Sequence, residues 1–255
     1  MQEFKNKVVV ISGALGDIGL AIASNYLEAS AIVILGDLLP EDEARNKLLQ
    51  LEKYQANLEY KQLDVSDHTR VESWIQYVEE KYGKIDCCIA NAARVTIKNF
   101  QTLSAEEWSL EMRVNVDGAF YFANFAAKSM VRTSVKGSII FLGSWAAHAV
   151  HQNLPAYSVS KAAVRMINQT MALEYAQFGI RVNEVAPGYV NAGLSKSVWS
   201  ELPEQRSLAQ NKVPLAQIME AGDVAVQVAW LTSYQCQHVT GASFVMDGGL
   251  SLLRP

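Results

Sequence analysis

The sequence contains few cysteines and no excess of basic residues, and both features limit the classes of protein to which it can belong. Only three cysteines occur in 255 residues, Cys87, Cys88 and Cys236, and the first two are adjacent. Three thiols cannot form a disulfide framework, so we expect reduced cysteines in a cytoplasmic protein. Lysine and arginine number 22 against 26 aspartates and glutamates, a formal net charge of -4 at pH 7. Because no basic excess is present to neutralise a phosphate backbone, we expect no nucleic-acid partner.

Long hydrophobic runs and flexible linkers are also missing. The most apolar long stretch, Gly118 to Val131, is interrupted by Asn124 and Lys128, whereas a bilayer span needs roughly 20 apolar residues. The run Val8–Ile11 is too short for the core of a signal peptide, so we expect no membrane partner. The six prolines are scattered, and no Pro- or Gly-rich segment divides the chain. This organisation predicts a single domain over residues 1–255.

Short strand-like runs alternate with longer helical segments. Half of the residues are hydrophobic and 19% are charged, which predicts a sizeable folded core. Seven runs bounded by Gly, Asp, Asn or Pro have the features of strands: Val8–Ile11, Ile32–Leu35, Leu58–Leu63, Ile85–Ala90, Ser138–Leu142, Arg181–Ala186 and Ser243–Met246. The gaps are long enough for the crossovers that parallel strands require. The alternation predicts an α/β fold, a doubly wound parallel seven-stranded sheet of Rossmann type with helices on both faces.

A glycine-rich turn follows the first predicted strand. Residues 12–19 read Ser-Gly-Ala-Leu-Gly-Asp-Ile-Gly and lead into a helix. Glycines let a backbone approach a pyrophosphate closely, and a helix N-terminus offers unpaired N–H groups. The candidate cofactor contacts in this turn are Gly13, Gly16, Asp17, Ile18 and Gly19. Glycine is also the default residue of tight turns, so a purely steric role fits the turn alone equally well.

Asp37 ends the second predicted strand, 18 residues after Gly19. A carboxylate in this position can accept hydrogen bonds from the ribose hydroxyls of an adenosine and repels a 2′-phosphate. No Arg or Lys lies in the glycine turn or directly after Asp37. The sequence therefore predicts NAD rather than NADP as cofactor, the alternative being that Asp37 is an ordinary exposed turn residue.

Tyr157 and Lys161 lie one helical turn apart and form a candidate acid–base pair. A cation near a phenol favours the phenolate and lowers the tyrosine pKa. The spacing alone is not specific, because Tyr77 and Lys81 share it; we interpret that second pair as a solvated helix face. What distinguishes Tyr157 is Ser144, 13 residues upstream at the end of a predicted strand. The three residues together favour catalysis.

The order and spacing of several motifs resemble the short-chain dehydrogenase/reductase family from Val8 to Gly249. The turn at residues 12–19 resembles the family's Thr-Gly-x-x-x-Gly-x-Gly. The other matching segments are Leu63-Asp64-Val65, Ala90-Asn91-Ala92-Ala93, Asn115, Ser144, Tyr157, Lys161, Pro187-Gly188 and Asp247-Gly248-Gly249. The resemblance implies cofactor contacts from Asp64, Val65, Asn91, Ala92, Pro187, Gly188 and Val190 as well as from Tyr157 and Lys161.

The same resemblance implies a mechanism. Ser144 would hydrogen-bond the substrate oxygen, and Tyr157 would transfer the proton while hydride passes to or from the nicotinamide. Lys161 would bind the nicotinamide ribose and tune Tyr157, and Asn115 would hold a water in a proton relay to Lys161. Asn115 has an alternative role, since its side chain could simply break a helix with a local backbone bond. No metal site is expected.

The chain departs from the family pattern in the glycine turn and near the carboxamide. Asp17 stands at the family's middle glycine, and we expect its carboxylate to point outward or to cap the helix. Ala90 and Ala93 replace an Asn and a Gly, which removes one side-chain contact. Ala192 replaces a threonine, so one hydroxyl contact is absent. These changes affect the cofactor pose and leave the class of reaction as it is.

The substrate is expected under a lid of about residues 189–222. That segment mixes polar and apolar residues, which favours a small hydroxylated substrate such as a sugar, polyol or hydroxy acid. His148 and His151 either line the opposite wall or lie in a solvated loop. The predicted activity is that of an NAD-dependent secondary-alcohol dehydrogenase. The alternatives are an NADPH-dependent 3-oxoacyl-(acyl-carrier-protein) reductase, which Asp37 and the acidic charge disfavour, and a non-catalytic dinucleotide-binding relative.

Two helices predicted at residues 115–131 and 157–177 carry broad apolar faces. In the family the equivalent helices pair between subunits, so the resemblance implies a homo-oligomer, a dimer or a tetramer. Burial of the same faces inside one subunit would give the same sequence pattern.

Overall fold

Seven runs of predominantly apolar residues form the strands of one parallel sheet in a computed structural model that describes residues 3–253. The strands are β1 (Val8–Ser12), β2 (Ile32–Asp37), β3 (Leu58–Gln62), β4 (Cys87–Ala90), β5 (Ser138–Leu142), β6 (Arg181–Pro187) and β7 (Ser243–Met246). Their spatial order is β3-β2-β1-β4-β5-β6-β7. All residues of β1, β4 and β5 are buried, because helices cover both faces of the sheet. The predicted doubly wound, seven-stranded parallel sheet is confirmed.

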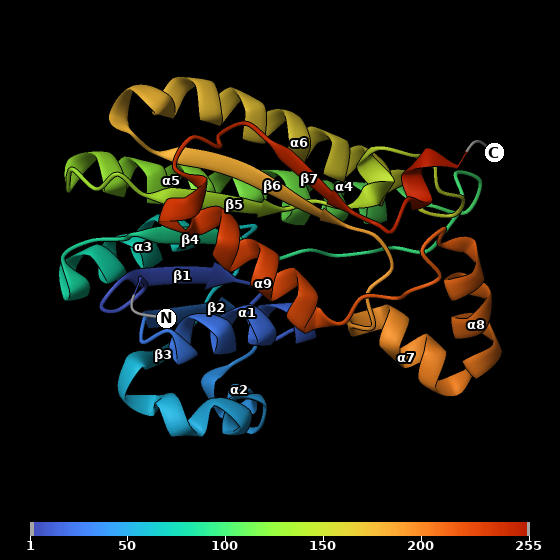
Figure 1. Cartoon of the computed structure of the whole chain (residues 1–255), viewed down its shortest axis with the longest axis horizontal. Helices are drawn as coiled ribbons and strands as arrows, with labels where there is room; N and C mark the ends of the chain where they lie inside the picture. Colours follow the sequence, from blue (N-terminus) through green and yellow to red (C-terminus); the bar gives the residue numbers. More distant parts are fainter. Residues whose placement is uncertain (1–2, 254–255) are drawn as a thin grey trace.

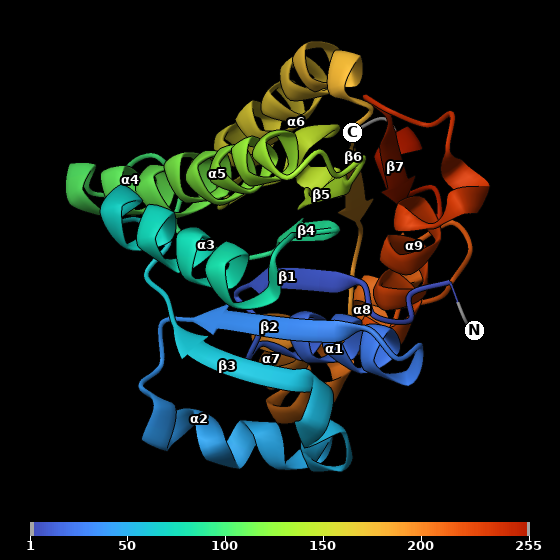
Figure 2. The same cartoon turned by 90° about the vertical axis from the view of Figure 1, so that its left-hand side faces the viewer.

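Helices cover both faces of this sheet, and others lie at its margins (Figure 2). They are α1 (Asp17–Glu28), α2 (Glu41–Leu48), α3 (His68–Tyr82), α4 (Ala105–Met112), α5 (Gly118–Arg132), α6 (Pro155–Tyr175), α7 (Gly193–Glu201), α8 (Pro203–Lys212) and α9 (Ala221–Thr232). Helices α3, α5 and α6 pack on one face and α1 and α9 on the other. Within residues 3–253, no helix has the length and apolar composition needed to cross a membrane.

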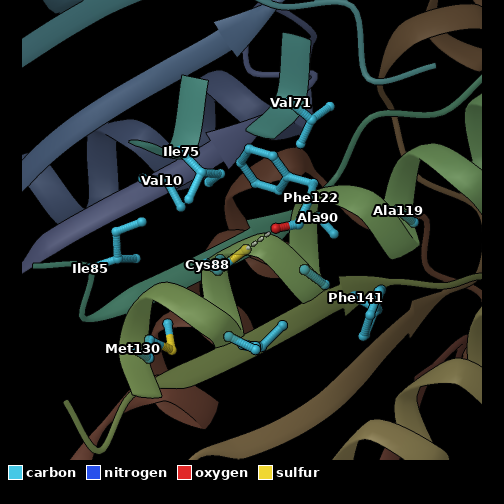
Figure 3. Close-up of a cluster of buried hydrophobic side chains, with 14 of the residues drawn as sticks. Val10, Val71, Ile75, Ile85, Cys88, Ala90, Ala119, Phe122, Met130 and Phe141 are labelled. Atoms are coloured by element: carbon cyan, nitrogen blue, oxygen red, sulfur yellow. Dashed lines mark hydrogen bonds between the residues drawn. The ribbon is translucent and has the colours of Figure 1, made fainter. Parts of the chain in front are cut away.

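The core under α3 and α5 contains one of the three cysteines (Figure 3). The Cys88 thiol lies 3.9 Å from the carbonyl oxygen of Phe122, whose ring packs 5.7 Å from that of Trp74. Burial raises the pKa of Cys88, and burial also raises the pKa of Cys87 to about 12. All three cysteines are free and buried, so at neutral pH they are protonated core residues rather than nucleophiles.

The order of the strands reverses at β1, which pairs with β2 on one side and β4 on the other. In open parallel sheets a ligand-binding crevice forms at such a point, outside the carboxyl ends of the strands. Helices α7 and α8 project beyond one end of the sheet (Figure 1), and the cavity described below is lined by both of them and by the turn that follows β1. The residues that directly follow β1, β4, β5 and β6 are therefore the candidates for a binding site.

Candidate active site

The glycine turn after β1 packs directly against the segment that follows β4. Gly13 has φ of 61°, and a Cβ there would lie 2.5 Å from the Cα of Ala92. The Asn91 amide nitrogen donates to the carbonyl oxygen of Gly13 at 2.7 Å, and a Cβ on Gly19 would lie 2.6 Å from that same oxygen. Packing within the protein therefore explains two of the three glycines.

Packing within the protein does not explain Gly16, so its surroundings indicate whether a dinucleotide fits the turn. A Cβ at this position would lie 3.8 Å from its nearest neighbour, so protein packing does not require glycine there. Gly16 is the N-cap residue of α1, and no side chain caps this end of the helix in the described structure. Free N–H groups beside an open glycine suit a phosphate, so the turn fits the pyrophosphate of a dinucleotide.

Asp37 lies at the carboxyl end of β2, next to the glycine turn. Its Oδ2 accepts a hydrogen bond from the backbone N–H of Leu15 at 2.9 Å, which leaves the carboxylate beside the turn as predicted. The structure also brings Lys47 to the same place, since its ammonium donates to the carbonyl oxygen of Leu15 at 3.2 Å. No sequence motif marks this lysine, which lies on α2, ten residues beyond Asp37.

Ser144, Tyr157 and Lys161 come together where β5 ends and α6 begins. Ser144 and Lys161 are buried, and the Lys161 ammonium lies 5.6 Å from the centre of the Tyr157 ring. The ammonium donates to the carbonyl oxygen of Leu142 at 2.6 Å, which fixes it at the end of β5. Pro155 occupies the first turn of α6, where its missing N–H does no harm, and so sets the start of this helix.

The acid–base properties of this pair differ from the expectation. Burial raises the pKa of Tyr157, and hydrogen bonding with Ser144 opposes the rise. Burial lowers the pKa of Lys161 to about 8, although the carboxylates of Glu184 and Glu111 act against this shift. The expected net fall in the pKa of Tyr157 is not found. The reason is that both groups are desolvated and the ammonium hydrogen bond goes to Leu142.

Asn115 lies in a π-helical segment, Arg113–Asp117, between α4 and α5. Its side-chain amide accepts from the Arg94 N–H at 2.7 Å and donates to the Arg94 carbonyl at 2.9 Å. The same amide nitrogen lies 3.0 Å from Ser160 Oγ, which in turn donates to the Tyr157 carbonyl. The buried amide therefore joins the segment after β4 to the helix that carries Tyr157, and π-helical turns often mark functional sites.

A cavity of about 750 Å³ joins most of the predicted residues. Those lining it are Gly13, Gly16, Asp17, Ile18, Gly19, Asn91, Ser144, Tyr157, Lys161, Pro187, Gly188 and Val190. Outside the lining are Asp37, Asp64, Val65, Ala92 and Asn115. Of these, Asp64 accepts from the backbone and hydroxyl of Ser66, and Val65 is buried against Gly118. The glycine turn and the Ser144–Tyr157–Lys161 set thus share one continuous space.

Asp17 contacts the lid instead of capping its own helix. Its Oδ2 accepts from the backbone N–H of Gly193, the first residue of α7, at 2.7 Å. Its Oδ1 lies 3.6 Å from the Lys196 ammonium. Of the two expected orientations of the Asp17 carboxylate, the helix cap is wrong, because Gly16 occupies the N-cap position and Asp17 begins the helix. The carboxylate points toward α7 and links the glycine turn to the lid.

An aromatic wall, which no motif predicted, lines the substrate side of the cavity. The rings of Trp145 and Tyr189 pack edge to face at 5.6 Å, and Trp199 lies 6.4 Å from Tyr189. His151 joins them at 5.2 Å from Trp145 and lines the cavity, whereas His148 is half-buried against Ser243 and Arg165. Trp145 follows β5, Tyr189 follows β6 and Trp199 lies on α7. The position of the first two directly after strands is the sequence feature that could have identified this wall.

The second tyrosine–lysine pair has a different environment from the one expected. The Tyr77 hydroxyl donates to Glu59 on β3, and the Lys81 ammonium contacts Glu59 Oε2 at 2.8 Å. The interpretation as a solvated helix face is wrong for Tyr77, because a strand carboxylate ties the pair to the sheet. The pair lies outside the cavity lining, and its contacts are structural.

Comparison with known proteins agrees with this geometry. A family model described as enoyl-(acyl carrier protein) reductase matches residues 13–251. A 3beta-hydroxysteroid dehydrogenase 1 from Eggerthella lenta is 31% identical over 98% of this chain and 95% of its own. An NADP-dependent (R)-specific alcohol dehydrogenase from Lentilactobacillus kefiri is 31% identical over 96% of each chain. The crystal structure of a short-chain type dehydrogenase/reductase from Mycobacterium marinum superimposes with a TM-score of 0.87 and 27% identity, covering 97% of this chain and 96% of that one. The chain belongs to the short-chain dehydrogenase/reductase family.

Proposed function

We propose that this protein is an NAD-dependent oxidoreductase that interconverts a secondary alcohol and its ketone. The observation that carries the proposal is the single cavity in which the Ser144–Tyr157–Lys161 set opens toward an uncapped helix N-terminus at Gly16. The first three residues supply acid–base chemistry at an oxygen, and the helix N-terminus suits a phosphate. The relatives named above are dehydrogenases, which supports the same class.

The residues of the chain divide the work between them. Ser144, fixed at the end of β5, holds the substrate oxygen beside Tyr157. Before oxidation the Tyr157 side chain is a phenolate, and the Lys161 ammonium stabilises its negative charge. During oxidation this phenolate accepts the proton of the substrate hydroxyl. Lys161 would also contact the nicotinamide ribose, and Asn115 keeps the helix of Tyr157 and the segment after β4 in register. A bound nicotinamide dinucleotide would supply or accept the hydride.

The choice between NAD and NADP depends on Asp37 and Lys47. Asp37 favours NAD because its carboxylate repels a 2′-phosphate and can accept from both ribose hydroxyls. Lys47 is the specific observation that favours NADP, since its ammonium lies near the turn and could pair with that phosphate. We propose NAD because Asp37 lies at the strand end itself, whereas the Lys47 ammonium is held on the Leu15 carbonyl.

The cavity supports a small hydroxylated substrate. The aromatic wall of Trp145, Tyr189 and Trp199 offers flat apolar faces, and His151 and Gln152 add polar groups near Ser144. Flat aromatic faces with a few convergent polar groups suit the alternating C–H and O–H surfaces of a sugar or polyol. Lys212, at the end of α8, also lines the cavity and would accept an acidic group, as on a hydroxy acid.

A spectroscopic assay tests the proposal. The purified protein is incubated with NAD or NADP and a panel of sugars, polyols, hydroxy acids and hydroxysteroids, and formation of the reduced cofactor is followed by absorbance. We expect turnover with NAD and at least one polyhydroxylated substrate. Fluorescence titration should show tighter binding of NADH than of NADPH; the reverse order, abolished by Lys47→Met, would assign the cofactor to NADP.

Substitution of Tyr157 by Phe tests the assignment of the acid–base residue. This change removes the hydroxyl and keeps the ring, so turnover should fall by at least about 100-fold while NADH still binds. Lys81→Met, in the pair tied to Glu59, serves as the control and should leave turnover unchanged. Full activity of the Tyr157→Phe protein would refute the mechanism.

A further inference from the structure

A fully buried carboxyl group lies behind the strand end that carries Ser144. Glu184 is in the middle of β6, between Phe141 on β5 and Ser243 on β7, with no exposed surface. The Ser243 hydroxyl donates to its Oε2, but its Oε1 has no hydrogen-bond partner among residues 3–253. A buried carboxylate is strongly unfavourable unless hydrogen bonds and opposite charges compensate it. One hydroxyl is not enough, so the charges around Glu184 decide its state.

Besides Ser243 on β7, the groups facing Glu184 come from helix α6 and from the segment that follows β5. Helix α6 contributes the cations Lys161 and Arg165. Burial raises the pKa of Glu184, and the Ser243 hydrogen bond and the charges of Lys161 and Arg165 oppose this rise. The segment after the short 3-10 helix Trp145–Ala147 contributes His148, whose Nε2 lies 3.4 Å from Ser243 Oγ and whose Nδ1 lies 3.4 Å from Arg165. Farther out, Glu111 on α4 acts on Lys161 and Asp247 acts on His148.

Only a glycine separates the Glu184 carboxyl from the backbone that positions the catalytic groups. A Cβ at Gly143 would lie 1.8 Å from Glu184 Oε1, so a side chain at this position and the carboxyl exclude each other. Gly143 joins Leu142, whose carbonyl oxygen receives the Lys161 ammonium, to Ser144. The carboxyl therefore packs against the residue between the two positions that fix Lys161 and Ser144.

We propose that Glu184 is a positioning residue whose buried carboxylate keeps the Lys161 ammonium charged beside Tyr157, with Gly143 providing the space for it. This inference rests on the proposed function, in which the Tyr157–Lys161 pair exchanges a proton with the substrate. A fixed negative charge favours every state of the pair that holds more protons. Its removal should therefore lower both apparent pKa values of the coupled pair.

The test is the pH profile of alcohol oxidation by the Glu184→Gln protein, measured as kcat in the presence of saturating cofactor. We expect the rise of kcat with pH to move to lower pH by at least about 0.5 unit, because glutamine keeps the shape of the side chain and removes its charge. The Glu184→Asp protein keeps the charge and should retain the wild-type profile. An unshifted profile in Glu184→Gln, with normal thermal unfolding, would overturn the proposal.

Two further variants test the proposal when Glu184→Gln does not fold and separate its failure from that of the proposed function. Should Glu184→Gln fail to fold, the double substitution Glu184→Ala with Gly143→Ala fills the same space with a methyl group, and the same shift is expected; a wild-type profile there would again refute the role. Tyr157→Phe is measured in parallel. If it stays active, the proposed function is wrong, whereas an inactive Tyr157→Phe together with an unshifted Glu184→Gln rejects only the role of Glu184.

Discussion

At the scale of single residues, a comparison of two glycines with positive φ distinguishes the cost of backbone strain from the cost of a steric clash. Gly83 ends α3 with φ of 77°, and a Cβ there would have nothing within 4 Å, whereas Gly13 has φ of 61° and a Cβ there would meet the Ala92 backbone at 2.5 Å. Gly83→Ala should destabilise the protein by about 1–2 kcal/mol, the strain of a left-handed residue. Gly13→Ala adds overpacking and should destabilise it by about 2–5 kcal/mol in urea denaturation. Equal losses would show that the turn has room to relax.

In the proposed mechanism, the Tyr157–Lys161 pair sets the pH dependence of alcohol oxidation. Oxidation needs a deprotonated phenol, and burial raises the pKa of Tyr157. The rate of alcohol oxidation should therefore increase with pH between about pH 7 and pH 10, wherever hydride transfer limits the rate. The opposite direction, ketone reduction, needs the protonated phenol and should slow over the same range. Initial rates in both directions test this, and a flat oxidation profile would contradict a titrating phenol.

At the scale of secondary-structure elements, the contact from Asp17 to α7 links cofactor binding to the lid. Asp17→Ala removes the charged acceptor of the Gly193 N–H, so α7 should loosen and NADH should dissociate about 3- to 10-fold faster. Lys196→Met is the control: its exposed pair with Asp17 at 3.6 Å contributes little, and the rate should change by less than about twofold. Stopped-flow fluorescence measures both. Slower release from the Asp17→Ala protein would mean that the carboxylate faces the pyrophosphate instead.

Sequence reasoning identified the strands and singled out Ser144, Tyr157 and Lys161 because these signals are local. The strand runs and the spacing of Ser144, Tyr157 and Lys161 each depend on residues close in the chain. Details that depend on packing between distant residues were not predictable in this way. Lys47 reaches the Leu15 carbonyl in the glycine turn only after α2 folds back, and Glu184 meets Gly143 only through the register of β5 and β6. The helix expected to begin at Asn115 begins at Gly118, because a π-helical segment precedes it.

At the scale of the whole molecule, the surface of α5 and α6 bears on self-association. Among the apolar residues of these helices, Phe122, Val164 and Met171 are buried inside the subunit, so part of the pattern belongs to the monomer core. Leu173 on α6 is 81% exposed, and Met166, about two turns earlier, is also exposed. We propose that these exposed apolar side chains pack against a second subunit, because burying an apolar patch away from water is favourable.

Light scattering after size exclusion tests the assembly. We expect two or four times the chain mass of 28.1 kDa. Leu173→Lys together with Met166→Lys should reduce the mass toward that of one chain, since two buried charges would oppose the contact. Leu49→Lys, at an exposed apolar position near the opposite edge of the sheet, is the matched control and should leave the mass unchanged. A wild-type protein that elutes as a monomer would refute the proposal.

The strand order of the sheet also has a consequence for biosynthesis. With β1 in place, β2 and then β3 add on one side, and β4, β5, β6 and β7 add in turn on the other. Since a nascent chain leaves the ribosome from its N-terminus, every strand after β1 emerges later than a strand it pairs with. Each new strand therefore finds one neighbour already made, and β1 to β4 with the glycine turn can form before Ser144, Tyr157 and Lys161 have been translated.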